Sequence, residues 1–436
     1  MKKIINFLNS KYYVKFIFYM VFFSFVSIGL FYVDKAIQGS QYNLALFFSQ
    51  NFLEDFLIMM IAGIITMVTI TFSTIMVVLT LYSGQFSPRT LKDFLQRKVP
   101  LNILGYFIGV SVYALISLVI TENNNTLIYS NMTLFALILI VISVVLFAYY
   151  IHYVSKSVQI NVYIDKMVSE AVDTIEKRKE KIKKDPLIQL ERKEEDEKKE
   201  YNAEYKSTRT GYLIDINKKK LLSYLMEHDL SVSVNIPLNE HVYEEDILFK
   251  YSKNNNKSFA FDEEVIADTF VISDESGSFS EYREKTMKLV EIAVRALSPG
   301  TNDPFTASTC IDQLGFVFMK LSDTYYSLHY HDEEGTERLT IKTLNYNDLL
   351  YDHFYQIYLY GKNDLTIISS MLKAFARIAG DSNHDMKVSL WAFAEYILKD
   401  FRVKDLEAFD FREIHVPLRD LSIRCNKYSD YKAMLE

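Results

Sequence analysis

The segment RALSPGTNDPFTA, at residues 295–307, contains the residue types that could bind an anion. A helix beginning at Pro304 would present free backbone amides at its N-terminus, and Arg295 lies close in the sequence, so a phosphate could dock there. Asp303 opposes this interpretation, because its carboxylate would cap the same amides and repel the ligand. An anion site and a structural corner between two helices both stay open, and the sequence favours the corner.

The corner interpretation gives a structural role to most of the unusual residues in this segment. Ser298 and Pro299 are expected to end the first helix, because the residue before a proline is pushed out of the helical region. Gly300 is expected to take a positive φ at little cost. Thr301 and Asn302 are the two residues for which the sequence suggests no structural role.

Potential metal ligands gather in a second segment, YSLHYHDEEGTE. They are His329, His331, Asp332, Glu333 and Glu334. Imidazole and carboxylate groups do bind metals, but a surface loop after a helix produces such a cluster through solubility alone, so no metal site is predicted. Cys310 and Cys425 have no partner at CxxC spacing and are expected to be buried free thiols.

The motifs of common catalytic sites are missing from the sequence. It contains no HExxH, GxSxG, phosphate-binding Walker loop, dinucleotide fingerprint or EF-hand loop. A formal net charge of −7 without a basic patch gives no support for nucleic-acid binding. We therefore expect neither an enzyme nor a cofactor, and no nucleic-acid partner.

A row of hydroxyl groups runs along one apolar segment. Thr66, Thr69, Ser73 and Thr80 recur at steps of three, four and seven residues, which places them on one face of a helix. Such a face can line a water-filled path through a membrane. It can equally form a packing surface, because small hydroxyl residues let helices approach closely and bond to their own backbone. Both roles stay open, and packing is the more common one.

The elements that position these residues begin with four apolar segments. They lie at residues 15–33, 56–81, 101–120 and 134–154. Each approaches the length that a helix needs to cross a hydrocarbon core of about 30 Å. The first segment is not a signal peptide, because large aromatic residues continue to its end. Residues 1–155 are therefore predicted to form a four-helix transmembrane domain in a lipid bilayer.

The charges between these segments predict the orientation. Basic residues precede the first segment, lie between the second and third, and follow the fourth, whereas the other two loops are acidic or balanced. By the positive-inside rule both termini are cytoplasmic.

A short amphipathic helix is predicted directly after the hydroxyl-bearing segment, at residues 87–98. Ser87 suits the N-cap and Pro88 the first turn, and Arg89 belongs to its basic side. This interfacial elbow could couple the membrane part to the cytoplasmic part, or it could serve only anchoring and topology, which is the simpler role.

The cytoplasmic part is predicted to be α+β. We expect a helical extension and charged linker at 156–207, a small β-rich module at 208–275 and a helical domain at 276–436. Alternating apolar residues predict strands in the β module, at 211–216, 230–236, 247–251 and 258–264. Helical periodicity predicts long helices in the last domain, at 285–297, 304–328, 364–379 and 388–401.

The chain resembles bacterial integral membrane proteins with domain of unknown function 2254. The resemblance rests on QFSPRTL, AYYIHYVSKSVQ, TGYLIDI and, most strongly, IAVRALSPGTNDPFTA. The signature corner consists of Arg295, Ser298, Pro299, Gly300, Asn302, Asp303 and Pro304. The resemblance implies four spans in the bacterial inner membrane and a cytoplasmic C-terminal part, with no settled activity. The chain departs from the family pattern at Pro237–Asn239, where a Pro-Gly-Asp turn is usual, and at residues 276–281, where an arginine is usual.

Two functions are consistent with the sequence. The first is an oligomeric channel-like or transport protein with a cytoplasmic regulatory domain, which needs a symmetric homo-oligomer because four helices rarely enclose a path. The second is a membrane-anchored regulatory or scaffold protein without a conducting path, since coupled transporters usually carry charged residues inside their spans. A cytoplasmic protein or a small ligand is the expected partner of the C-terminal part.

Overall fold

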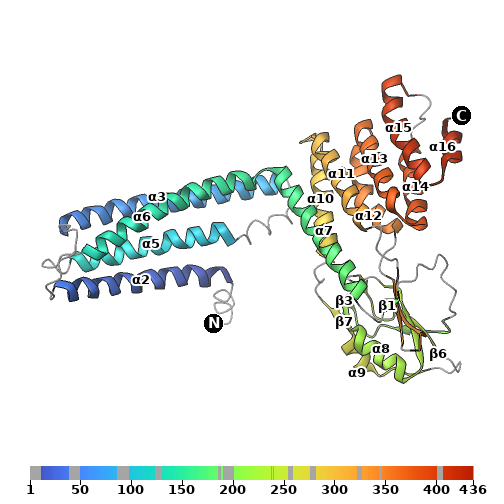
Figure 1. Cartoon of the computed structure of the whole chain (residues 1–436), viewed down its shortest axis with the longest axis horizontal. Helices are drawn as coiled ribbons and strands as arrows, with labels where there is room; N and C mark the ends of the chain where they lie inside the picture. The colour runs from blue at the N-terminus through green and yellow to red at the C-terminus, as the bar shows by residue number, and fades with distance from the viewer. Residues whose placement is uncertain are drawn as a thin grey trace. The chain divides into compact units, whose positions relative to one another are not determined.

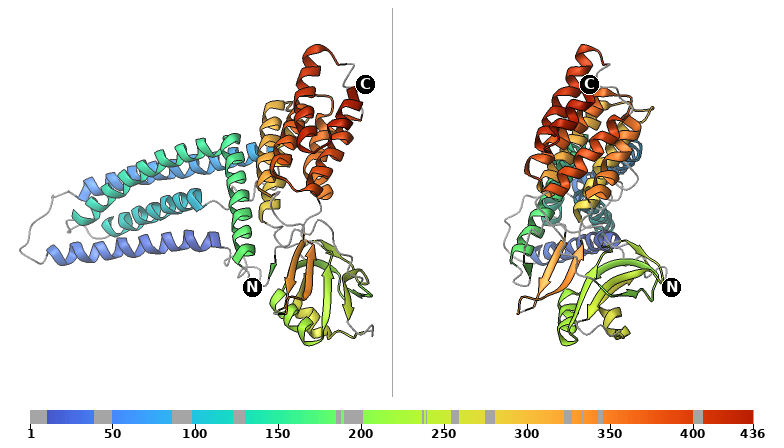
Figure 2. Two further views of the ribbon diagram at one scale, coloured as in Figure 1. Left: turned by 45° about the vertical axis from the view of Figure 1, so that its right-hand side comes forward. Right: turned by 90° about the vertical axis from the view of Figure 1, so that its right-hand side faces the viewer.

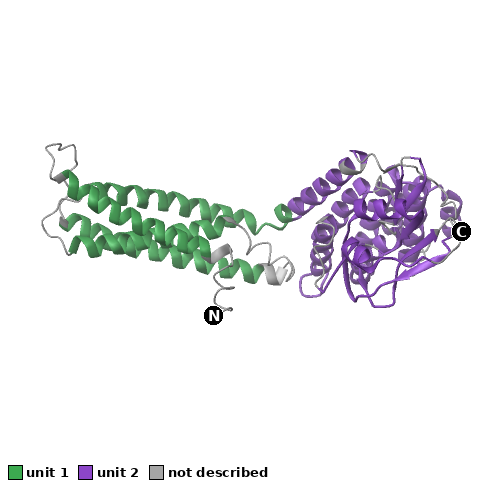
Figure 3. Cartoon of the chain, turned by 90° about the horizontal axis from the view of Figure 1, so that it is seen from below, with its two compact units in different colours: residues 1–163 green, residues 164–436 purple. Residues whose placement is uncertain are grey.

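A computed structural model describes most of the chain, in two compact units that comprise residues 1–163 and 164–436 (Figure 3). The described residues are 11–38, 50–85, 98–122, 130–184, 188–189, 201–236, 238, 240–253, 259–274, 281–321, 327–332, 334–342, 346–399 and 406–435.

The first unit consists of four long apolar helices (Figure 1). They are α2 (Lys11–Gln38), α3 (Gln50–Gln85), α5 (Lys98–Glu122) and α6 (Ser130–Ser157). Each contains a window long and apolar enough to cross a membrane, which confirms the four predicted spans. The elbow that we predicted at residues 87–98 lies outside the described residues, apart from Lys98 at the start of α5.

Helix α5 lies at the centre of this bundle and contacts the other three helices. Two glycines one turn apart bring it close to α2. A Cβ atom added at Gly105 would lie 2.8 Å from the Tyr19 ring, and one added at Gly109 would lie 2.5 Å from the Phe23 ring. The spacing of these glycines is the small-residue pattern by which helices pack closely in membranes.

Polar side chains inside the bundle bond from one helix to another. The carboxylate of Asp34, near the end of α2, accepts hydrogen bonds from the Asn131 and Met132 amides at the start of α6. Ser27 and Ser117 bond between α2 and α5 at 2.9 Å. Because lipid offers no replacement partner, each of these bonds favours this arrangement of helices.

The second unit begins inside α7 (Ile160–Lys184), a helix that follows the fourth span almost directly. One face of α7 is buried at Ile164, Met167, Ala171 and Ile175, whose spacing is that of an amphipathic helix. Residues 160–184 of the predicted extension and linker therefore form a packed helix, which ends two residues before Pro186.

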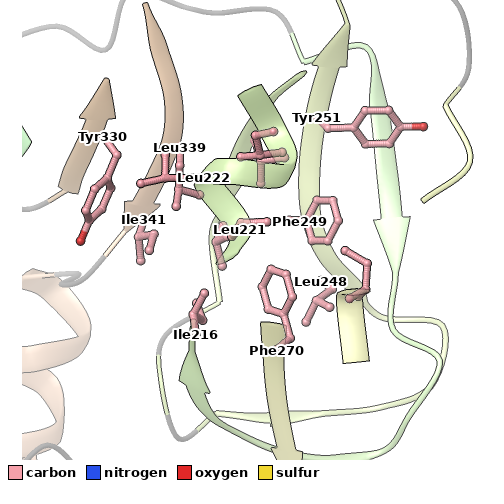
Figure 4. Packing of buried hydrophobic residues seen from close by; sticks show 14 of the residues in the cluster. Ile216, Leu221, Leu222, Leu248, Phe249, Tyr251, Phe270, Tyr330, Leu339 and Ile341 are labelled. Atoms are coloured by element: carbon pink, nitrogen blue, oxygen red, sulfur yellow. The ribbon is translucent and has the colours of Figure 1, made fainter. Parts of the chain in front are cut away.

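The β part of this unit contains two sheets and two short helices. A six-stranded sheet has the order β1-β8-β9-β4-β6-β2, and a three-stranded sheet has the order β5-β3-β7. The elements are β1 (Ile188–Gln189), β2 (Ala203–Lys206), β3 (Gly211–Ile216), α8 (Lys218–Glu227), β4 (Leu230–Val234), β5 (His241–Val242), β6 (Ile247–Lys253), α9 (Glu263–Thr269), β7 (Phe270–Ser273), β8 (Ser327–His331) and β9 (Glu337–Lys342). Side chains from both sheets and from α8 share one buried core (Figure 4).

The β part differs from the contiguous module that we predicted at residues 208–275. Strands β8 and β9 come from the predicted helical domain, and β9 pairs with β4 in parallel. The predicted helix at 304–328 was too long: α11 ends at Leu321, and Leu328 and Tyr330 alternate into the sheet core. The predicted strand at 258–264 was also wrong, because Asp262 caps α9 there. These strands form because they pair with segments that are remote in the sequence. The local periodicity of apolar residues does not show such pairing.

The helical part is a stack of helix pairs in two layers (Figures 1 and 2). The helices are α10 (Glu281–Ala296), α11 (Pro304–Leu321), α12 (Tyr346–Gly361), α13 (Leu365–Asp381), α14 (His384–Leu398), α15 (Ala408–Arg424) and α16 (Tyr428–Leu435). Helices α11, α13 and α15 contact one another in that order and form one layer, and α10, α12 and α14 form the other. The three pairs have the two-layer packing of helical repeat proteins.

The helices within each layer run parallel and in register. The Ser370 hydroxyl bonds that of Ser308 at 3.1 Å, near the starts of α13 and α11. Ser369 donates to the Glu413 carbonyl near the start of α15. In the other layer, Asn383 before α14 donates to the Tyr346 hydroxyl at the start of α12. The three corners α10–α11, α12–α13 and α14–α15 therefore lie at one end of the stack, and the starts of α12 and α14 lie at the other.

Candidate functional site

The predicted hydroxyl row lies on the outward face of α3. Thr66, Thr69, Ser73 and Thr80 are all exposed, so they point away from the bundle of their own chain. The hydroxyls of Thr66, Thr69 and Thr80 donate to the carbonyl four residues earlier, at 2.8, 2.9 and 3.0 Å. These bonds satisfy the hydroxyl protons and leave oxygen lone pairs facing outward.

The opposite face of α3 is fixed against α6 by a buried tyrosine. Thr71 is buried, and its backbone carbonyl accepts a hydrogen bond from the Tyr150 hydroxyl at 2.9 Å. The Thr71 hydroxyl is already bonded to Met67. This contact lies on the buried face of α3, opposite the hydroxyl row, and α3 packs along this face mainly on α5.

The elbow residues cannot be placed beside this face. Ser87, Pro88 and Arg89 lie outside the described residues, so the predicted coupling role stays a prediction.

At the signature corner, Asp303 caps α11. Its carboxylate accepts bonds from the Thr306 amide at 3.1 Å and the Thr306 hydroxyl at 2.6 Å. These bonds, the hydroxyl first, hold the pKa of Asp303 below its ordinary value. The backbone amide of Asp303 bonds back to the Ala296 carbonyl at 2.8 Å. The carboxylate thus occupies the amide that an anion would need.

The left-handed residue of the corner is Asn302, with φ of 47°. Our prediction that Gly300 takes a positive φ is wrong, since Gly300 is absent from the left-handed residues and a Cβ added there would meet nothing within 4 Å. Asparagine tolerates this conformation better than most residues with a side chain. Asn302 thus has a structural role that its position in the sequence did not reveal.

The remaining corner residues close the end of α10. The Ser298 hydroxyl donates to the Arg295 carbonyl at 2.7 Å, and the amides of Thr301 and Asn302 both bond to the Ser298 carbonyl at 2.9 Å. Arg295 is exposed in the last turn of α10. Pro304 is the first residue of α11, as predicted.

A second corner with the same pattern joins α12 to α13. The residues Gly-Lys-Asn-Asp at 361–364 correspond to Gly-Thr-Asn-Asp at 300–303, and Asp364 caps α13 by accepting from the Thr366 amide at 2.8 Å. The two corners touch, because a Cβ added at Gly361 would lie 3.2 Å from the Leu297 side chain. The repeated four-residue pattern was visible in the sequence and could have revealed the stack.

The described histidine and acidic residues of the segment at 327–338 do not gather into a set of three possible ligands. Among the described residues, no group of three His, Cys, Asp or Glu side chains could hold a metal ion, and Glu333 lies outside them. Burial disfavours the charged form of Asp332, but bonds from Arg338 and the Thr336 amide outweigh it and lower its pKa. Asp332 is thus engaged in the β8–β9 turn.

Both cysteines are buried free thiols, as predicted. Burial raises the pKa of Cys425 to about 11 and that of Cys310 further, so neither is a reactive thiolate at neutral pH.

A shallow depression on the β part offers little chemistry. It lies between β2, β5 and β6, and its charged residues include Glu204, Lys206 and Glu245. Lys206 pairs with Glu245 at 3.1 Å, and Glu204 pairs with Lys250 at 3.1 Å. Exposed ion pairs of this kind are common on surfaces and indicate no reaction.

Comparison with family models agrees with the four apolar helices that could span a membrane. The family model described as "Predicted membrane protein (DUF2254)" matches residues 9–377, which is most of the chain. Searches of curated proteins and of solved structures gave no match. The match covers all four candidate spans and both four-residue corners. The chain therefore belongs to the DUF2254 family of predicted membrane proteins.

Proposed function

We propose that this protein forms a homo-oligomeric, channel-like transport pathway in the bacterial inner membrane, with the second unit acting as a cytoplasmic regulatory domain. The observation that carries the proposal is the outward hydroxyl face of α3. Thr66, Thr69, Ser73 and Thr80 face away from the subunit, so a second subunit or lipid must cover them. Around a symmetry axis, four or more such faces would surround a path lined by hydroxyl oxygens.

The positions of the charged residues in the spans fit a channel-like path better than a coupled transporter. In the four candidate spans, charged residues lie only near the ends, for example Asp34 and Lys35 in the first and Glu54 and Asp55 in the second. Coupled transporters usually carry ionisable groups at mid-membrane depth. Hydroxyl oxygens can replace part of the hydration shell of an ion or a small polar solute without such groups.

The test begins with the oligomeric state. A native mass in mild detergent that corresponds to a symmetric oligomer is expected, and a monomer would contradict the pathway. The oligomer in liposomes should then give ion or solute flux above that of empty vesicles.

The residues of the pathway are tested by matched substitutions on α3. Thr69→Leu and Ser73→Leu should each lower flux at least about tenfold, because they replace oxygen ligands by apolar groups. Met76→Leu, at another exposed position of the same helix, should leave flux unchanged. Equal flux from all three variants would contradict the assignment of α3 to the path.

A membrane-anchored scaffold is the second candidate, and the stack of helix pairs favours it. Repeats of this kind commonly present extended surfaces to protein partners. The hydroxyl row would then serve only packing, since its bonds to its own backbone let it face lipid or another helix equally well. An oligomer that gives no flux, together with a partner that co-purifies through the second unit, would support this candidate.

A further inference from the structure

Large apolar side chains are exposed at all three corners of the helical stack. Phe305, the second residue of α11, is 80% exposed, and Phe409, the second residue of α15, is 90% exposed. Leu359 and Tyr360, in the last turn of α12, are also exposed. Helix α12 is the middle helix of its layer, whereas α11 and α15 are the outer helices of theirs. Exposing a phenylalanine side chain to water is unfavourable, so we expect a partner to cover the apolar side chains at these three corners.

The corners lie on one edge of the stack. Helices α11 and α15 both pack in register on α13, and the ends of α12 and α14 meet where the Tyr358 and Tyr396 rings lie 5.8 Å apart. Neighbouring helix axes are about 8–10 Å apart, which places Phe305 and Phe409 on the order of 20 Å from each other. We call this set of Phe305, Leu359, Tyr360 and Phe409 the corner edge.

Each corner also carries an exposed cation. Arg295 lies in the last turn of α10, Lys362 follows α12, and Lys399 follows α14. The carboxylates of Asp303 and Asp364 lie at the same corners, but both accept from amides at helix N-termini, which offset their charge. Exposed aromatic rings next to long cationic side chains are the composition of segments that bind at a membrane interface.

Separated apolar side chains favour a bilayer over a protein as the partner. A protein interface needs one contiguous patch, whereas a lipid interface accepts each ring independently. The bilayer is also close at hand, because α7 begins at Ile160, just after the fourth span ends at Ser157. Such a tether raises the effective concentration of the membrane surface, so a few side chains are enough.

We propose that the corner edge docks the second unit on the lipid headgroup region of the membrane, with Phe305 and Phe409 inserted among the acyl chains and Arg295, Lys362 and Lys399 at anionic headgroups. Glu407 and Asp410 flank Phe409 and weaken the attraction there. We therefore expect anionic lipid to affect Phe305 more strongly than Phe409.

The experiment uses the full chain in vesicles. Cysteine introduced by Phe305→Cys or Phe409→Cys is labelled with an environment-sensitive fluorophore, and the buried native thiols give a low background that the unsubstituted protein measures. Asp385→Cys is the matched control, since this exposed residue at the start of α14 lies at the opposite end of the stack. Brominated lipids then report contact between the fluorophore and acyl chains.

Docking predicts quenching at positions 305 and 409 that is at least about threefold stronger than at 385. Equal quenching at all three positions would overturn the proposal. Self-quenching that disappears on dilution with unlabelled protein, without lipid quenching, would show that a second copy covers the edge and would also overturn it. Circular dichroism confirms that each labelled variant is folded.

The contribution of the cations is tested by combining Arg295→Gln, Lys362→Gln and Lys399→Gln. Quenching at position 305 should then fall in vesicles with anionic lipid and stay unchanged in purely zwitterionic ones. No change in either vesicle would exclude headgroup recognition by these residues. None of these outcomes depends on whether the protein conducts.

Discussion

At the scale of single residues, the signature corner contains one residue with a positive φ, and it is not the glycine that the sequence predicted. Glycine is the usual residue at positive φ, yet the residue with φ of 47° is Asn302. The reason lies in the closure of α10: two successive amides bond to the Ser298 carbonyl, and the chain must then reverse before Asp303 can cap α11. Asn302, the residue just before the cap, both donates to the Ser298 carbonyl and makes this reversal.

Substitution of Asn302 should therefore be costly, and substitution of Gly300 should not. We expect Asn302→Val to lower the free energy of unfolding by about 1–3 kcal/mol, because a β-branched side chain is strained at positive φ. Asn302→Gly should be tolerated, and Gly300→Ala should be neutral. Urea unfolding followed by fluorescence of Trp391, the one tryptophan in the sequence, measures all three. Equal losses for Asn302→Val and Gly300→Ala would contradict this assignment.

Asp303→Ala separates the two interpretations of the corner. A structural cap predicts a loss of about 1 kcal/mol in unfolding free energy and no gain in anion affinity. An anion site predicts tighter binding of inorganic phosphate once the carboxylate is removed, which isothermal titration calorimetry would detect. Asp385→Ala, at an exposed position in the first turn of α14, serves as the control.

A buried histidine makes the helical stack sensitive to acid. His353 is fully buried: its Nδ1 donates to the Leu349 carbonyl at 2.8 Å, so Nε2 accepts from the Thr286 hydroxyl at 2.9 Å. Burial lowers the pKa of His353 to about 4, whereas the Leu349 bond opposes the shift. The unfolded chain, with a histidine pKa of about 6.5, therefore binds the proton more tightly than the folded chain.

Stability should be fully present above pH 6.5 and fall as the pH drops toward 4. The loss amounts to about 3 kcal/mol at most, since each pKa unit corresponds to about 1.4 kcal/mol. His353→Leu should flatten this dependence in urea unfolding between pH 4 and 7. His384→Leu, at an exposed histidine of the same helical part, is the matched control substitution. An unchanged slope in His353→Leu would show that other groups cause the loss.

At the scale of elements, the contact between α2 and α5 depends on a missing side chain. Gly109→Ala should disrupt it, because the new Cβ would lie 2.5 Å from the Phe23 ring and 3.1 Å from the Tyr19 carbonyl. We expect a loss of about 1–3 kcal/mol or a lower melting temperature in detergent. Gly29→Ala, where nothing lies within 4 Å, is the control and should slightly stabilise α2. Similar melting temperatures for both variants would contradict this packing.

At the scale of the whole molecule, the second unit is interwoven. The chain leaves the sheets after β7, builds α10 and α11, returns for β8 and β9, and then completes the stack. The parallel pairing of β4 with β9 joins Val232 to Leu339, residues more than a hundred positions apart. The six-stranded sheet is therefore completed by strands that lie between helices of the stack in the sequence.

Residues 208–275 alone should consequently fail to fold. The fragment lacks β2, β8 and β9, and with them the buried side chains of Tyr330, Leu339 and Ile341. We expect no cooperative unfolding transition in its circular dichroism, whereas residues 164–436, the whole second unit, should show one. A cooperative transition in the short fragment would mean that the six-stranded sheet is dispensable.

Features set by neighbours along the chain were determined by the sequence alone. The four spans follow from length and hydropathy, because a helix satisfies its own backbone bonds wherever it lies. Helical periodicity predicted α10, α13 and α14, and the cap by Asp303 followed from its place before Pro304.

The tertiary structure decided which segments that are distant in the sequence pair or pack with one another. It added β8 and β9 to the six-stranded sheet, buried the face of α3 that contains Thr71 so that the hydroxyl row faces outward, and placed three corners at one end of the stack. The free energy of strand pairing and of helix packing comes from contacts between residues that are far apart in the sequence. A local sequence pattern does not specify which segment will be the partner.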